Sequence, residues 1–229
     1  MGALCSKGPK DNVGVPHGRL VDYKQEDDKG PTEIININVV NDGGNVSGNS
    51  KFATYLNQCR SKGEKFVDQE FPATQASLIT DWNEEAEEVR DHAPEWRSIH
   101  WMRAEDIPEL NREAGGLALF VDKIEPSDIQ QGGLGDCYFL SVLSMLAENP
   151  HRVRKLFAHH EVLPEGIYGV NLTKNGEAVE VVVDSFLPCK EQKPCFSRAH
   201  GSELWVLILE KVWAKLHGDY CRIIGGLSD

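Results

Sequence analysis

The chain has 229 residues, 40% of them hydrophobic, and a formal net charge of −12 at pH 7. This length suits one sizeable domain with a tail, or two small units, and the apolar content is sufficient for a core. The acidic charge argues against nucleic acid as a partner, and we find neither a secretory signal nor an apolar run near the roughly 20 residues that span a bilayer. The six cysteines are irregularly spaced, which predicts reduced thiols in a cytosolic protein.

The amino terminus carries a pattern typical of lipid modification. Gly2 follows the initiating methionine and Ser6 stands at the favoured position, which predicts N-myristoylation of Gly2. One myristoyl chain binds membranes only marginally, so a second signal is needed, and Cys5 is a candidate for palmitoylation. So short a pattern also occurs by chance, but Cys5 beside it favours dual acylation. We therefore expect a cytoplasmic protein attached to the inner leaflet of a membrane.

Three segments follow from the distribution of residue types. Residues 1–50 are mostly polar with scattered glycine and proline, which predicts a flexible tether. Residues 51–94 form a lead-in segment, in which helices are expected within 52–68 and at 80–90. Residues 95–229 carry the motifs that indicate chemistry.

The most informative motif lies at 131–140 and reads QGGLGDCYFL. A glycine-rich loop precedes Cys137, and the apolar spacing of 137–147 predicts a helix that ends before Pro150. A cysteine in the first turn of a helix is stabilised as its thiolate by the helix dipole. The N–H groups of that turn have no intrahelical partner and can hold an oxyanion, and Gln131 can add an amide donor.

A buried core cysteine is the alternative interpretation of Cys137, because cysteine is often buried as a small apolar residue. Against it, three glycines in four positions before the Asp-Cys pair allow the close approach of a substrate backbone. The residue types alone leave the two interpretations balanced.

Two further elements are predicted after this helix. Asn-Gly at 175–176 separates β-branched runs at 167–172 and 178–183, which is the strongest short-range signal for a β-hairpin. Residues 204–216 have the apolar spacing of a long amphipathic helix that a glycine ends. Two helices with a hairpin between them predict an α+β fold.

Four stretches carry a resemblance to a known family. They read WMRAEDI at 101–107, DIQQGGLGDC at 128–137, VEVVVDSFLP at 179–188, and GSELW at 201–205 running into LEKVWAKL at 209–216. Several motifs in the right order make a specific signal, and they resemble the calpain family of calcium-dependent, papain-like cysteine proteases. A weaker match at 66–72 resembles the short lead-in ahead of these protease cores. The acylated start resembles that of some protist calpain-like proteins.

The resemblance implies a papain-like protease core of the calpain type, with its first subdomain at 95–229. It implies an endopeptidase that performs limited intracellular proteolysis of protein substrates. Carried over position by position, it makes Cys137 the nucleophile and Gln131 the oxyanion-hole donor, and Tyr138 stands where the family usually has tryptophan. The catalytic His and Asn of the family belong to a second subdomain, expected beyond Asp229. The isolated chain is therefore expected to be nearly inert until that subdomain is supplied.

Histidines within the chain fall where the family has no catalytic base. Those nearest the motifs stand at 151, 159, 160, 200 and 217. We interpret them as surface or helix-capping residues.

The resemblance also implies a calcium site, formed by the side chains of Asp128 and Glu203 and by carbonyls near Val121 and Lys123. Calcium prefers several hard oxygen ligands, which fits this set. From the residues alone, a loop acid at Asp128 and a helix-terminus acid at Glu203 are the simpler interpretations.

A second functional hypothesis is a membrane-tethered, non-catalytic calpain-like scaffold or regulatory protein. The expected lack of a base within the chain favours it. The intact Cys137 and Gln131 oppose it, because a protein freed from catalysis need not keep them. The reactivity of Cys137 towards iodoacetamide separates the two hypotheses.

Overall fold

The computed structural model describes residues 50–82, 87–112, 116–121, 123–199 and 201–225. These residues belong to a unit that begins at Glu33. The predicted acylation sites Gly2 and Cys5 lie outside the described residues, as does nearly all of the predicted tether. Acylation and the segment boundaries at 50 and 94 therefore stay predictions. None of the helices in the described part is long and apolar enough to cross a membrane.

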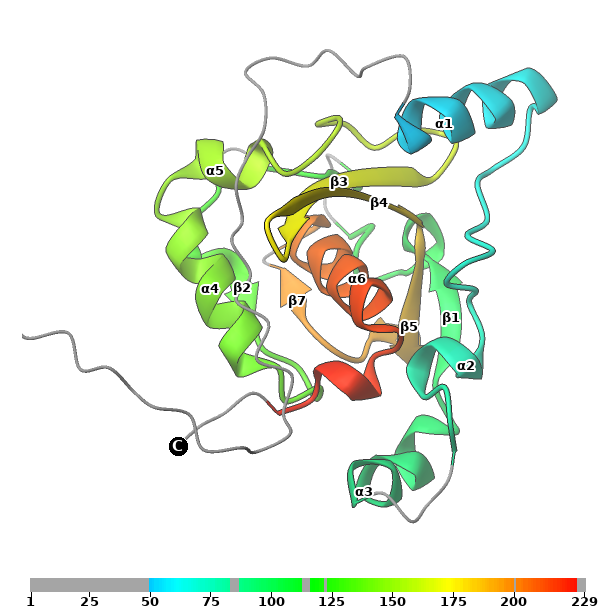
Figure 1. Ribbon diagram of the computed structural model, residues 1–229, viewed down its shortest axis with the longest axis vertical. Helices are drawn as coiled ribbons and strands as arrows, with labels where there is room; N and C mark the ends of the chain where they lie inside the picture. Colours follow the sequence, from blue (N-terminus) through cyan, green and yellow to red (C-terminus); the bar gives the residue numbers. More distant parts are fainter. Residues whose placement is uncertain (1–49, 83–86, 113–115, 122, 200, 226–229) are drawn as a thin grey trace, which may run out of the picture. The chain divides into compact units, whose positions relative to one another are not determined.

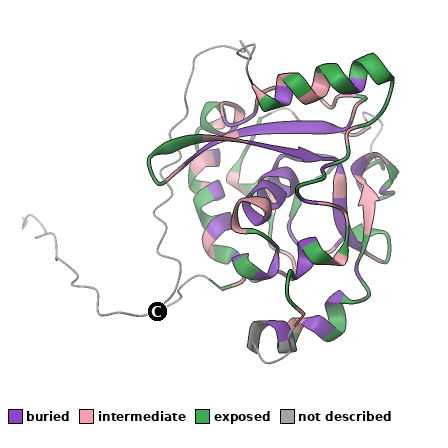
Figure 2. Cartoon of the chain, turned by 45° about the vertical axis from the view of Figure 1, so that its right-hand side comes forward, coloured by how far each residue is buried: buried purple, intermediate pink, exposed green. Residues whose placement is uncertain are grey.

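Helix α6 (Trp205–His217) lies at the centre of the described unit (Figure 1). The helix is confirmed at its predicted place and is followed by Gly218 with φ of 110°. Every residue from Trp205 to Ala214 is buried, including Glu210 and Lys211 (Figure 2). An amphipathic pattern predicts one solvent-exposed face, so the burial of this helix on all sides differs from the prediction. Its polar side chains Glu210 and Lys211 bond to Ser197 and Asp184 instead of water.

The predicted hairpin is confirmed as β3 (Ile167–Lys174) and β4 (Glu177–Asp184), which pair antiparallel over their full length. The turn residues Asn175 and Gly176 have φ of 53° and 82°. Two consecutive positive φ angles are what a type I′ turn requires, which explains the Asn-Gly sequence. The hairpin lies over α6 in Figure 1, and the Lys211 ammonium of α6 contacts Asp184 at the end of β4.

The remaining strands form two small antiparallel sheets. One has the order β1 (His100–Arg103), β5 (Phe186–Lys190), β6 (Lys193–Pro194), and the other joins β2 (Ile129–Gln130) to β7 (Arg198–Ala199). Strands β5, β6 and β7 follow the hairpin along the chain. Because β7 pairs with β2, this part of the chain lies beside the segment just before the loop at 131–136, which we call the nucleophile loop.

Helix α4 (Cys137–Ala147) has the limits that the apolar spacing predicted. Its inner face packs against α6, where the rings of Phe139 and Trp213 stack 5.1 Å apart at 6°. Pro150 stands at the first position of the next helix, α5 (Pro150–Arg154), which explains why α4 stops before it.

The lead-in segment contains α1 (Lys51–Lys62), α2 (Gln75–Leu78) and α3 (Glu87–Trp96). Helix α1 confirms the first predicted helix, and its Phe52 packs on Ile167 and Val182 of the hairpin. The second predicted helix, at 80–90, was placed too early.

Tertiary contacts explain this displacement of the second helix. The Thr80 N–H donates to Asp219 Oδ2 (2.9 Å), and the Tyr220 N–H donates to the Ser77 carbonyl (3.1 Å). These bonds tie residues 77–80 to the segment that follows α6. The chain between α2 and Trp82 is therefore not helical, although its residue types allow a helix.

Three short 3₁₀ turns complete the described elements. They are η1 (Ala104–Asp106), η2 (Pro126–Asp128) and η3 (Cys221–Ile223). Turn η2 leads directly into β2 and the nucleophile loop, and η3 follows α6.

Candidate active site

Cys137 is exposed and is the first residue of α4. The residue before it, Asp136, is the N-cap, but its side chain does not cap the helix. Its backbone carbonyl instead accepts from the N–H groups of Phe139 (2.9 Å) and Leu140 (3.2 Å). Because the Asp136 side chain does not cap the helix, it leaves the N–H groups of Cys137 and Tyr138 to other acceptors. A core cysteine would be buried, whereas this thiol is open to solvent beside those groups.

Two of the three loop glycines, Gly132 and Gly135, are required by the chain's own backbone. A Cβ at Gly132 would lie 1.4 Å from the carbonyl oxygen of Phe196, so no other residue fits there. The Gly133 N–H donates to the Cys195 carbonyl (3.3 Å), and Gly135 has φ of 79°. Gly132 thus allows the loop to lie against the segment 195–199. The approach of a substrate backbone to this loop stays a prediction.

Gln131 is exposed and lies between two anchors of this loop. On one side Gln130 pairs with Arg198 in the β2–β7 ladder. On the other side Gly132 rests on the Phe196 backbone. Gln131 and Cys137 therefore belong to one loop and helix start that is fixed from the same neighbouring segment.

Tyr138, which stands where the family usually has tryptophan, ties α4 to the end of α6. Its hydroxyl donates to the Ile223 carbonyl (3.2 Å) and accepts from Trp213 Nε1 (3.1 Å). Burial raises the pKa of this hydroxyl, so it stays neutral. Tyrosine thus provides both a donor and an acceptor at this place.

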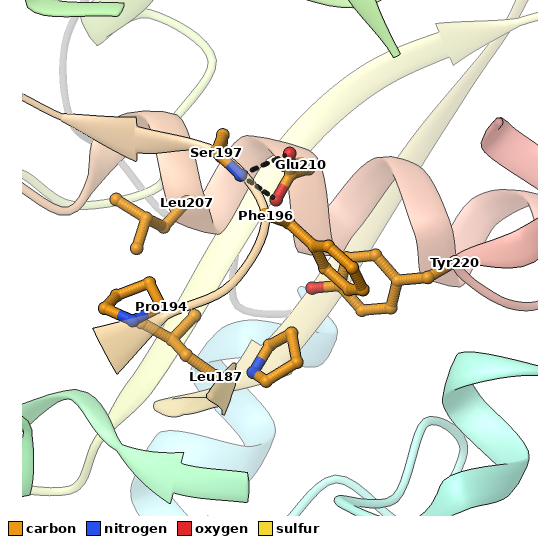
Figure 3. A pocket seen from close by; sticks show the side chains of 8 residues that line it. Leu187, Pro194, Phe196, Ser197, Leu207, Glu210 and Tyr220 are labelled. Carbon is orange, nitrogen blue, oxygen red and sulfur yellow. Dashed lines mark hydrogen bonds between the residues drawn. The ribbon is translucent and has the colours of Figure 1, made fainter. Parts of the chain in front are cut away.

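Two buried carboxyl groups lie behind the loop, and the sequence analysis did not single them out. The side chains of Asp136 and Glu210 belong to residues that are 1% and 3% exposed. Glu210 accepts the Ser197 N–H with both oxygens, at 2.9 and 3.2 Å (Figure 3). Burial raises the pKa of Asp136, and burial together with the Asp136 charge raises the pKa of Glu210. The signal in the sequence that could have identified Glu210 is its position as an acid within the most apolar stretch of α6.

Of the four predicted calcium positions, the structure brings two into direct contact. Glu203 is buried, and its carboxylate accepts the Val121 N–H (2.5 Å) and Trp205 Nε1–H (3.1 Å). Asp128 Oδ2 accepts the Glu125 N–H (2.7 Å), and the Lys123 ammonium lies 3.0 Å from the Glu125 carboxylate. Asp128 and Lys123 are thus joined through Glu125.

These residues suit calcium in their chemistry, because carboxylate and carbonyl oxygens are the ligands it prefers. The contact between Glu203 and Val121 already holds one carboxylate against the loop backbone. Within the described part of the chain, no three His, Cys, Asp or Glu side chains gather as a metal cluster. Two carboxylates and backbone carbonyls would therefore have to make up the set.

Of the histidines expected at the surface or at helix ends, His160 and His217 agree with this expectation and His159 does not. His160 Nε2 lies 3.0 Å from the Arg154 carbonyl, and His217 Nδ1 lies 2.9 Å from the Trp213 carbonyl one turn earlier. His159 is different, because its ring stacks on Phe52 with centroids 4.8 Å apart and burial lowers its pKa to about 4. It is a neutral packing residue rather than a surface one. His200 lies outside the described residues.

Comparison with known proteins gives matches over most of the chain. The profile of the calpain family of cysteine proteases matches residues 66–229. The chain is 38% identical over 170 residues to the calpain-type cysteine protease DEK1 of Arabidopsis thaliana, which covers 73% of this chain and 8% of that protein. It is 32% identical over 184 residues to the calpain-2 catalytic subunit of Mus musculus, which covers 79% of this chain and 25% of that protein. The chain thus spans a quarter or less of the length of these relatives.

Proposed function

Because this chain belongs to the calpain family of cysteine proteases, we propose that it is the nucleophile-bearing part of a cysteine endopeptidase that acts on protein substrates within the cell. One observation carries the proposal. The Cys137 thiol is exposed at the first turn of α4, while the neighbouring Asp136 carboxyl is buried and does not cap that turn. A nucleophile and free N–H donors therefore lie side by side, as acyl transfer needs.

In the proposed reaction, Cys137 Sγ forms a bond to the scissile carbonyl carbon, and its proton passes to a histidine. The carbonyl electron pair moves to the oxygen, which accepts hydrogen bonds from the Cys137 N–H and the Gln131 amide. The C–N bond then breaks, the amine leaves with the proton from the histidine, and water hydrolyses the thioester. The histidine and its orienting asparagine come from outside residues 50–225.

Without that base, the chain alone should be a poor catalyst, because general-base help is typically worth about a hundred- to ten-thousand-fold. The second subdomain is therefore part of the proposal as a partner. Exposed apolar side chains at Val142 and Met145 on α4 give it one surface on which to pack.

The proposal predicts that iodoacetamide modifies Cys137 before the buried cysteines. Burial raises the pKa of Cys189 to about 12, so its thiolate fraction at pH 7 is about a thousand-fold below that of an ordinary thiol. Burial also raises the pKa of Cys59. Time-resolved peptide mass mapping of the folded chain should show Cys137 alkylated at least about a hundred-fold faster than Cys189.

The same experiment in urea is the control, because unfolding should make the thiols nearly equal. If Cys137 of the folded chain reacts no faster than Cys189, the nucleophile assignment fails. The non-catalytic scaffold then becomes the better hypothesis.

We also propose that calcium is held by the carboxylates of Asp128 and Glu203 and by the carbonyls of Val121 and Lys123. When bound, the ion would supply positive charge that ties the loop at 121–128 to the beginning of α6. To reach it, Glu203 would exchange its present N–H partners for the ion. One of those partners is the indole of Trp205, so an optical signal should accompany binding.

Titration with calcium is therefore expected to change the tryptophan fluorescence of the folded chain. Glu203→Gln removes the charge but preserves the shape and should abolish the change, whereas magnesium should not reproduce it. A flat titration up to millimolar calcium would count against the site. An unaltered response in Glu203→Gln would show that the ion binds elsewhere.

A further inference from the structure

The carboxyl groups of Asp136 and Glu210 are both buried, and the Asp136 charge is near enough to raise the pKa of Glu210. Both Asp136 oxygens are buried and receive no hydrogen bond from a donor among the described residues. The neighbouring acid is Glu210, whose own oxygens already accept the Ser197 N–H. Two ionised carboxylates have only acceptors, so they bond to one another only when one of them keeps its proton.

We propose that Asp136 and Glu210 share one proton and that this carboxyl pair positions the nucleophile Cys137 and the Gln131 loop. The inference rests on the proposed function, because it assigns positioning residues to that same site. Neither acid contacts the reacting atoms, so they act through the backbone that they hold.

The path from Asp136 to the nucleophile is direct. Asp136 is the N-cap of α4, and its carbonyl accepts the first hydrogen bonds of the helix. Any shift of its carboxyl therefore moves the turn that carries the Cys137 thiol and N–H. Because the side chain turns into the core rather than onto the helix, it leaves the N–H groups for a substrate oxyanion.

The path from Glu210 leads to the loop through the segment 195–199. Glu210 holds the Ser197 N–H with both oxygens (Figure 3). This segment in turn receives the Gly133 N–H at the Cys195 carbonyl, and the Phe196 carbonyl lies against Gly132. Pairing of β7 with β2 then fixes the residue before Gln131. One carboxyl pair thus links the two parts of the proposed oxyanion site.

The surroundings leave the pair as the group that titrates. Glu210 lines a small pocket together with Ser197, Phe196 and Tyr220 (Figure 3). Burial and the nearby carboxylates raise the pKa of the Tyr220 hydroxyl, and burial with the nearby thiol of Cys189 raises that of the Cys195 thiol, so both stay neutral. Two further charges act nearby: Glu95 helps to raise the pKa of Cys195, and Asp184 helps to raise that of Tyr220 while it is bonded to Lys211.

The sign of the pH dependence follows from the raised pKa values. The folded chain binds the shared proton more tightly than the unfolded chain does, so the stabilisation is complete below the ordinary range of carboxyl pKa values. It is lost as pH rises through the raised pKa of the folded state. The pair then carries two buried negative charges, which repel each other and displace the Asp136 turn from the 195–199 segment.

Three variants of the 229-residue chain test this inference by the rate of Cys137 alkylation between pH 6 and pH 9.5. Glu210→Gln reproduces the protonated acid, since its amide accepts from Ser197 and donates to Asp136 permanently. Glu210→Leu keeps the volume but removes both bonds. Phe52→Ala is the matched control, because it opens a cavity in the separate cluster with Ile167 and Val182.

If only the Cys137 thiol titrated, its alkylation rate would follow the titration curve of a single thiol. We expect the wild-type rate to fall below this curve at alkaline pH, and the rate of Glu210→Gln to follow it. At pH 7, Glu210→Gln should stay within about two-fold of wild type, and Glu210→Leu should be about ten-fold slower per folded molecule. Phe52→Ala should lower the melting temperature and leave the Cys137 rate unchanged.

A reactive Cys137 whose rate and pH profile are the same in wild type and both Glu210 variants would overturn the positioning role alone. A rate that falls as much in Phe52→Ala as in Glu210→Leu would also overturn it, as an effect of stability. A wild-type Cys137 no faster than Cys189 would overturn the proposed function and this inference together. If Glu210→Leu does not fold, the inference is decided by comparing the Cys137 alkylation rates of Glu210→Gln and wild type at alkaline pH.

Discussion

Replacing Cys137 by serine is expected to lower kcat for protein hydrolysis by the assembled protease on the order of a million-fold, as removal of a nucleophile does in other proteases. The serine hydroxyl has nearly the same size and stands at the same exposed helix start. It is a far weaker nucleophile than a thiolate. Turnover of an unstructured protein substrate, with the second subdomain present, measures the effect.

Gln131→Ala gives the matched comparison, because it removes an oxyanion donor and leaves the nucleophile. We expect it to cost about a hundred-fold or more in kcat, while Cys137 alkylation continues at the wild-type rate. Cys137→Ser should unfold at the same temperature as wild type, which separates lost chemistry from lost structure. Undiminished turnover by Cys137→Ser would refute the assignment of the nucleophile.

Local signals carried most of the correct predictions about the fold. The limits of α4 follow from apolar spacing and from Pro150, and the hairpin follows from Asn175-Gly176, whose backbone angles are those the turn needs. Each of these signals lies within the element that it predicts. The helix expected at 80–90 is found only from Glu87 onward, because bonds from distant residues hold the chain at Thr80 out of a helix.

The environment of α6 shows what spacing alone cannot provide. The pattern at 204–216 indicated a solvent face, yet the acid and the base at its centre are buried. Glu210 accepts the N–H of Ser197, which precedes β7, and Lys211 is bonded to Asp184 at the end of β4. Only the fold brings these groups together, so a sequence pattern within the helix cannot distinguish a buried pair from a solvated face.

The same limit applies to the candidate site. Cys137 and Gln131 could be singled out because they belong to one contiguous motif. The reason for Gly132 could not, because the atom that excludes a side chain there belongs to Phe196. The carboxyl pair behind the loop was missed because Asp136 and Glu210 acquire their roles only where α4 meets α6.

Replacing Lys211 by alanine is expected to reduce the free energy of unfolding by about 3–5 kcal/mol, because it leaves a buried charge without its partner. The Lys211 ammonium donates to Asp184 Oδ1 (2.5 Å) and to the Phe186 carbonyl (2.6 Å), and both charged side chains are fully buried. Asp184 Oδ2 also accepts the Asp68 N–H (2.8 Å) from the lead-in segment. Unfolding of the chain in urea measures the loss.

Arg60→Ala is the control, since its ion pair with Glu165 is solvent-exposed at the arginine and should contribute about 1 kcal/mol or less. Equal losses for the two variants would mean that the buried pair does not hold the lead-in and the hairpin on α6. The double variant Lys211→Met with Asp184→Leu removes both charges and should recover part of the loss. Recovery cannot be complete, because Asp184 also accepts N–H groups of Asp68 and Phe186. The loss of unfolding free energy that remains then measures what the hydrogen bonds of the Asp184 carboxylate contribute to joining the lead-in segment to the hairpin, apart from its charge pair with Lys211.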